Sequence, residues 1–227
     1  MKQKTIPKIS TLAQQCYEQL QNDIITGTLK PGEKLKIEPI KQRLTIGQSP
    51  IREALSRLVA SGLVHTEDNK GFRVSTLSEH DIRDIYLTFN RIENLALTLA
   101  IEQGDDAWEA SIVAALHQLA IIELKQEPVP YALWTERNYN FHVALISGCM
   151  SPTLLEIRRN LYLKFDRYCR MAYHITKDAL SGNHDEHKKL AEAVLKRDIK
   201  KTHELMNYHI TGSLEEVIQK LKENNII

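Results

Sequence analysis

Histidine carries the most distinctive chemistry in this 227-residue sequence, because six of its nine histidines lie between His142 and His209. His142, His187 and His209 each have apolar residues three and four positions away, so each is expected to point inward from a helix. Asn138 lies four residues before His142 and shares its face. His203, six residues from His209, is rotated by about 120° and is expected to face outward.

Three inward imidazoles and one short oxygen donor, drawn from three helices, suit a divalent ion such as Zn²⁺ or Ni²⁺. The predicted metal set is therefore Asn138, His142, His187 and His209. Spacing alone leaves a second interpretation open, in which each buried histidine is hydrogen-bonded to a neighbour and binds no metal.

Long helices must position these residues. Between residues 76 and 227 the apolar periodicity predicts helices over 79–103, 106–125, 130–147, 152–179, 183–196 and 198–222. About six helices of this length form an all-α bundle. On the 152–179 helix, Arg158, Arg167 and Arg170 could supply charge to an anionic ligand, although spacing selects none of them. At least two of the three are expected to form surface ion pairs.

The first 76 residues have a different pattern. Helices are predicted over 10–25, 38–44 and 48–60, followed by a β-hairpin formed by residues 64–67 and 72–74. Three short helices and a hairpin describe a winged helix-turn-helix, which places the start of its third helix in the major groove of DNA. The chain is thus mostly α, with a predicted DNA-binding domain at 1–76 and a helical domain at 77–227.

Seven residues of the first domain are predicted to contact DNA. Gln48, Ser49 and Arg52 lie on the outer face of the third helix, and Arg52 is the best candidate for a base contact. Lys41 and Arg43 are expected to contact phosphates, with a solvated surface charge as an equal alternative. Lys70 and Gly71, at the hairpin tip, are expected near the minor groove.

Charge is divided along the chain in the same way. The formal net charge of +1 is the sum of +5 over residues 1–75 and −4 over residues 76–227, and the basic part suits an anionic partner. No apolar run is long enough for a membrane span, and no signal peptide is expected. The three cysteines, Cys16, Cys149 and Cys169, form no disulfide pattern, which favours the cytoplasm.

The first domain resembles the DNA-binding domain of GntR-family regulators. The resemblance rests on residues 29–35 (LKPGEKL), 49–55 (SPIREAL), 62–64 (GLV) and 71–74 (GFRV). The family usually has Ser-Arg before this Ser-Pro, whereas this chain has Gly47 and Gln48. Because glutamine pairs best with adenine, the operator is expected to differ from the common family half-site at the base that faces Gln48.

The second domain resembles the FCD effector domain of FadR-like members of that family. Asn138, His142, His187 and His209 fall where these proteins carry a D-x-x-x-H…H…H metal set, with Asn138 in place of the aspartate. Phe89 stands where the family often has an arginine that helps to hold a carboxylate ligand. The resemblance implies a divalent metal ion and a small carboxylate effector.

These features predict a cytoplasmic homodimeric transcriptional regulator, expected to be a repressor, that binds double-stranded operator DNA and senses a small organic acid through a bound divalent metal. No catalytic residue is assigned, because no carboxylate is placed as a general base. Two alternatives stay open: a metal-dependent enzyme with an N-terminal docking module, and a regulator that senses only metal.

Overall fold

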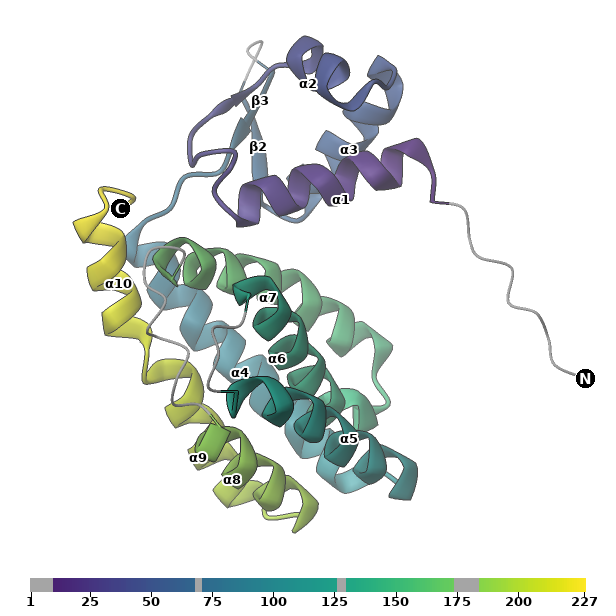
Figure 1. Cartoon of the computed structure of the whole chain (residues 1–227), viewed down its shortest axis with the longest axis vertical. Coiled ribbons are helices and arrows are strands. Elements are labelled where there is room, and N and C mark those ends of the chain that lie inside the picture. The colour runs from purple at the N-terminus through teal and green to yellow at the C-terminus, as the bar shows by residue number, and fades with distance from the viewer. Residues whose placement is uncertain (1–9, 68–70, 126–129, 174–183) are drawn as a thin grey trace, which may run out of the picture.

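The computed structural model describes residues 10–67, 71–125, 130–173 and 184–227. Its elements gather into a small mixed domain and a larger helical domain below it (Figure 1). The predicted winged helix-turn-helix followed by an all-α bundle is confirmed. Lys70 and the end of the predicted 152–179 helix lie outside the described residues.

Three helices and a three-stranded sheet make up the small domain. They are α1 (Leu12–Ile25), α2 (Ile37–Leu44), α3 (Gln48–Ala60), β1 (Lys34–Leu35), β2 (Val64–Glu67) and β3 (Gly71–Val74). The sheet is antiparallel in the order β1-β3-β2. Strand β1 was not predicted, since two residues are too few to show a period-two pattern.

The apolar face of α3 holds this domain together. Ile51, Leu55 and Leu58 are fully buried, and they pack in one cluster with Leu20 and Ile24 of α1. The opposite face of α3 is exposed. The predicted orientation of the third helix is therefore confirmed, and its polar residues are presented to solvent.

The helical domain is built around α4 (Glu79–Gln103), which packs against α6, α7 and α9. The remaining elements are α5 (Asp106–Glu123), α6 (Tyr131–Ile146), the 3₁₀ turn η1 (Ser147–Cys149), α7 (Pro152–Tyr173), α8 (His184–Leu195), α9 (Ile199–Thr211) and α10 (Leu214–Glu223). Its apolar cluster is separate from that of the first domain.

The predicted helix over 198–222 is wrong in one respect, because it is divided into α9 and α10 at Gly212. The amide of Gly212 caps α9 by donating to the Tyr208 carbonyl over 2.8 Å. A Cβ at Gly212 would lie 2.6 Å from the same oxygen, so the chain needs a glycine there. Periodicity continues across the break, with Met206, Ile210 and Val217 all buried, which conceals it from sequence analysis.

Trp108 fixes the helices that carry the site. Its indole Nε1 donates to the Ala144 carbonyl over 3.0 Å, which ties the start of α5 to the end of α6. Gly104 and Gly148 leave room for the ring. Within the described ranges, none of the helices combines the length and apolar character that a membrane span requires.

Candidate functional site

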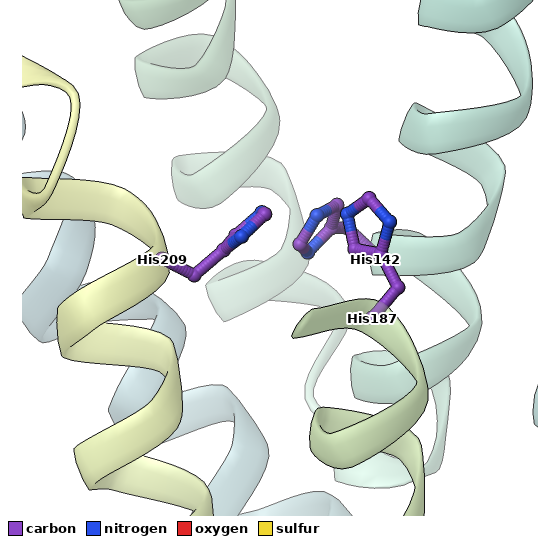
Figure 2. A group of neighbouring side chains, drawn as sticks. All are labelled: His142, His187 and His209. Atoms are coloured by element: carbon purple, nitrogen blue, oxygen red, sulfur yellow. The ribbon is translucent and has the colours of Figure 1, made fainter. Parts of the chain in front are cut away.

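Three histidines from three helices converge inside the helical domain, as predicted. His142 of α6, His187 of α8 and His209 of α9 each offer a ring nitrogen, and these donor atoms all lie within 4.8 Å of one another. Figure 2 shows the three rings turned toward one another. His142 and His187 are buried, and His209 is 14% exposed. Donors this close, with one helix each, have the arrangement of a metal-binding triad.

Buried polar atoms without partners lie in the same place. Asn138 Oδ1 and His187 Nε2 are buried and accept or donate no hydrogen bond among the described residues. An unpaired buried polar atom costs free energy, which a bound ion would recover. The residues present therefore fit a divalent cation held by His142, His187 and His209, with the Asn138 oxygen as a fourth donor.

Two carboxylates that sequence analysis missed support the histidines from behind. Glu123 Oε1 lies 2.9 Å from His187 Nδ1, and Glu186 Oε2 lies 2.9 Å from His209 Nδ1. Trp134 Nε1 donates to the same Glu123 oxygen over 3.1 Å. A carboxylate at Nδ1 orients an imidazole so that Nε2 faces a metal. Glu186 precedes His187 in the chain, but its partner is on α9, so sequence spacing could not pair them.

Burial favours the neutral form of His142 and His187. Burial, together with the neighbouring charges of His209, His187 and Arg158, holds the pKa of His142 well below its usual range. Burial also lowers the pKa of His187, although the hydrogen bond and charge of Glu123 partly oppose this. Neutral imidazole is the form that binds a metal.

Two other histidines of the region have different surroundings. The prediction that His203 faces outward is wrong, because its Nε2 lies 2.9 Å from Thr98 Oγ1 and 3.1 Å from the Asn94 carbonyl on α4. The face of α9 that carries His203 packs against α4 instead of facing solvent. His184 is the first residue of α8, and its Nδ1 lies 3.4 Å from Glu123.

A cavity of ≈ 320 Å³ opens beside the histidines. Asn138, His142 and His209 line one part of it, and Arg158 lines another. The remaining lining residues are largely aromatic or carboxylic, namely Phe89, Glu93, Trp134, Tyr162, Phe165, Asp166, Glu186, Tyr208 and Glu216. This volume and lining suit a small organic molecule with one polar group at each end.

Arg158 is the arginine of α7 that the structure places in this cavity. It is 2% exposed, and its Nε donates to Glu93 Oε1 over 2.8 Å. Its guanidinium carbon lies 5.4 Å from the centre of the Phe89 ring. Phe89 occupies the position at which FadR-like proteins often have an arginine. A cation thus reaches this part of the cavity from α7 instead of from α4.

The expectation that at least two of the three α7 arginines form surface ion pairs is wrong. Arg158 and Arg167 are both buried, and Arg170 is half-buried with its Nε 2.7 Å from Asp166 Oδ2. From residue 161 onward the described side chains of α7 are buried or half-buried, and Arg158 in its exposed first half points into the helical domain, so these arginines have little free surface. Sequence periodicity identifies the apolar face of α7. It cannot show that the first domain covers part of the polar face of the same helix.

Carboxylates outnumber cations around the cavity. Four acidic side chains line it, whereas Arg158 is the one arginine or lysine among its described lining residues. Burial raises the pKa of Asp166, although Arg170 opposes this effect. Without a further positive charge the cavity would repel an organic anion, and a divalent cation at the histidines would reverse that balance.

The predicted DNA-contacting residues of α3 lie together at its start. Gln48, Ser49 and Arg52 are exposed in the first two turns. With its amide oxygen toward Arg52, Gln48 accepts hydrogen bonds from Nε over 3.3 Å and Nη2 over 3.1 Å. The pair is therefore aligned before DNA is bound, next to a helix N-terminus that favours phosphate.

The other predicted DNA contacts are more dispersed. Lys41 lies 3.3 Å from Glu38, and Arg43 lies 2.6 Å from the buried Asp23 carboxylate. Gly71 begins β3 with a φ of +91°, a conformation that favours glycine. Arg43 is 43% exposed and can still face a phosphate while bound to Asp23. All these DNA contacts, and that of Lys70, stay predictions.

Family models match both domains. Residues 12–74 match the model described as "Bacterial regulatory proteins, gntR family", and residues 84–212 match the FCD domain. These two ranges cover the winged domain and most of the helical domain, including all four predicted metal ligands.

Known proteins match along nearly the whole chain. The HTH-type transcriptional repressor GlaR of Escherichia coli (strain K12) is 35% identical over 212 residues, which are 92% of this chain and 96% of GlaR. The HTH-type transcriptional regulator BphR of Paraburkholderia xenovorans (strain LB400) is 35% identical over 94% of this chain and 88% of its own. The solved structure of E. coli McbR/YncC has the same fold, with a TM-score of 0.78 at 20% identity, over 92% of this chain and 98% of that one.

The buried histidines predict how the metal-free protein responds to acid. The pKa of His142 is lower in the folded protein than in the unfolded chain. As the pH falls below about 6.5, the unfolded chain therefore takes up a proton at this residue before the folded protein does, and the free energy of unfolding decreases. Chelator-treated protein is expected to lose about 1 kcal/mol from this residue between pH 6.5 and 5.5, measured by urea unfolding. His142→Gln should show a smaller loss, and His117→Gln, at an exposed position of α5, should match wild type. Equal losses in all three proteins would contradict the assignment.

Proposed function

Because this chain belongs to the GntR family of DNA-binding transcriptional regulators and carries an FCD domain, we propose that it is a repressor whose operator binding is controlled by a small organic acid held at a divalent metal ion. The observation that carries this proposal is the cavity that joins the histidine triad and Asn138 to Arg158. Its relatives are transcriptional regulators, so the chain is assigned to regulators and not to metal-dependent enzymes.

Repression and dimerisation are the parts of the proposal that concern DNA. The relative GlaR is named a repressor, which supports the same role here. A homodimer places two copies of α3 in successive major grooves, one helical turn apart, on a pseudo-palindromic operator. Gln48 and Arg52 would then read the same bases in each half-site.

The metal site of the proposal consists of His142, His187, His209 and Asn138. Three imidazoles and a neutral oxygen suit Zn²⁺ or Ni²⁺ and keep the full positive charge of the ion. Such an ion would supply coordination positions for a carboxylate. Glu123 and Glu186 would hold the imidazole rings in the binding orientation.

The organic acid would lie between the triad and Arg158. Arg158 Nε and Nη2 are occupied by Glu93, which leaves Nη1 without a hydrogen bond among the described residues. The aromatic rings of Phe89, Tyr162 and Phe165 suit the carbon skeleton of the ligand. Because a cavity of ≈ 320 Å³ exceeds what a metal ion alone needs, an acid-responsive regulator is favoured over one that senses only metal.

Arg52 tests the DNA-binding part of the proposal. Arg52→Ala is expected to weaken binding to an operator selected in vitro by about 10- to 100-fold, because a good bidentate base contact contributes about 1–3 kcal/mol. Gel-shift titration measures the affinity, and circular dichroism should be unchanged because the side chain is exposed. Lys188→Ala, an exposed cation on α8, serves as the control. Operator selection in vitro with the Gln48→Arg variant should return a different base at one position of the half-site. An operator identical to that of wild type would refute the role of Gln48 in base recognition.

Calorimetric titration with Zn²⁺ and Ni²⁺ tests the metal site. Wild-type protein freed of metal by chelator is expected to bind one ion, and His209→Ala should bind it at least about 10- to 100-fold more weakly. Asn138→Asp should bind it more tightly, because the added negative charge lies in the predicted ligand set. His117→Ala is the matched control. Unchanged affinity in Asn138→Asp would show that the site is misplaced.

A screen of small carboxylic acids for release of the selected operator tests the effector. Release is expected with Zn²⁺ present and not with chelator, because the cavity otherwise has an excess of carboxylates. The double variant Arg158→Met with Glu93→Gln removes both charges of the buried pair and leaves neither unpaired. It should keep Zn²⁺ binding but lose the response to the acid. A response that survives in this variant would refute Arg158 as the anchor.

A further inference from the structure

Helix α7 is part of the helical domain and lies on the side of it that faces the DNA-binding domain (Figure 1), where it packs against α1. Arg158, Tyr162 and Phe165 line the ligand cavity. Just beyond Phe165 on the same helix, Arg167 and Tyr168 contact the segment that joins the two domains. We call this segment, Ser75–Ser78, the linker; it runs from the end of β3 to the start of α4.

Arg167 holds the first residue of the linker. Its Nη2 donates to the Ser75 carbonyl over 2.8 Å, and the side chain is 3% exposed. Burial lowers the pKa of Arg167 to about 10, so the guanidinium stays charged at neutral pH. The negative charge of Asp81 partly opposes this lowering. The contact with the Ser75 carbonyl gives the buried guanidinium a hydrogen-bond acceptor in the linker main chain.

Tyr168 holds the last residue of the linker. The Ser78 amide donates to the Tyr168 hydroxyl over 3.1 Å, and this hydroxyl lies 2.8 Å from Asp81 Oδ2 as donor. Ser78 is also the N-cap of α4, since its Oγ accepts from the Asp81 amide over 3.1 Å. One phenol thus joins α7, the linker and the first turn of α4.

Two further side chains of α7 touch turns of the DNA-binding domain. Met171 lies at the turn after α1, where a Cβ on Gly27 would be 3.5 Å from its Cε. Lys164 lies at the turn after α3, where a Cβ on Gly62 would be 2.9 Å from its Cε. Both glycines have a positive φ, +76° and +74° respectively, so these turns have defined shapes. Helix α7 therefore contacts the ends of α1 and α3 as well as the linker.

We propose that Arg167 and Tyr168 are positioning residues for operator binding, which clamp the linker onto α7 and so set the orientation of the DNA-binding domain. Through the same helix, the clamp transmits occupation of the ligand cavity to α3; this second role rests on the proposed function. A displacement of α7 at Arg158 or Tyr162 moves Arg167 and Tyr168 with it, because an α-helix is rigid over two turns. Neither residue lines the ligand cavity or belongs to the DNA-binding domain, so both act through the linker.

Four proteins test the clamp: wild type, Tyr168→Phe, Arg167→Met and, as the matched control, Lys188→Met on α8. Hydrogen exchange of peptides covering residues 75–81, followed by mass spectrometry, reports on the linker directly. Tyr168→Phe is expected to speed this exchange about tenfold, since it removes the acceptor of the Ser78 amide. Affinity for the operator selected by wild type should fall about tenfold in both clamp variants, because the two DNA-binding domains of a dimer are then less well oriented.

Coupling is measured with Zn²⁺ alone as the probe, as the ratio of operator affinities with the ion and with chelator. Wild type and Lys188→Met are expected to share one ratio, and the clamp variants should have a ratio closer to one. Arg167→Lys keeps the charge and can still reach a carbonyl, so its operator affinity is expected to lie between that of Arg167→Met and that of wild type. If Arg167→Met folds poorly, Arg167→Lys takes its place in the comparison.

The outcomes separate the two proposals. Linker exchange and operator affinity equal to wild type in both clamp variants would overturn the clamp, whatever the ligand does. A wild-type ratio of one would instead refute Zn²⁺ as a controlling ligand, and the clamp would still be decided by exchange and affinity.

Discussion

The buried ion pair between Arg158 and Glu93 determines where α7 lies against α4. With both side chains at 2% exposure or less, neither charge can be hydrated, and loss of one partner would cost about 3–5 kcal/mol. The pair therefore fixes one arrangement of two helices. That arrangement places aromatic rings of α4 and α7 around the cavity and brings the end of α7 to the linker. The ligand cavity and the domain orientation depend on the same contact.

Charge is organised at three scales in this protein. Along the chain, a basic first domain precedes an acidic second one, so the net charge of +1 conceals an anion-binding surface. Around the cavity, four carboxylates face one arginine, and an organic anion needs a cation beside it. At the triad, burial lowers the pKa of His142 and of His187, which favours the neutral form that a cation requires. The excess of carboxylates around the cavity thus calls for a cation, and the triad supplies the donors that suit one.

Sequence patterns predict what is local here and miss what is distant. Helical periodicity gives the α4 bounds, the inward face of all three histidines of the triad and the outward face of α3. The division at Gly212 escapes it, because buried residues keep their spacing across the break. Glu123, Glu186 and the choice of Arg158 escape it too, since each partner lies on another helix. His203 was misplaced because one helix shows its own faces and not what packs on them.

The contacts between α7 and the linker limit how strong any coupling between ligand and operator can be. Arg167 donates to Ser75 and the Ser78 amide donates to Tyr168, and a third hydrogen bond joins Tyr168 to Asp81 in the first turn of α4. At about 0.5–1.5 kcal/mol each, they could carry about 1.5–4.5 kcal/mol, which spans the 1–3 kcal/mol usual for coupled sites. Coupling is reciprocal, so operator DNA must change ligand affinity by the same factor. A larger switch would need rearrangement of the Arg158–Glu93 pair itself, and loss of one partner of that pair costs about 3–5 kcal/mol.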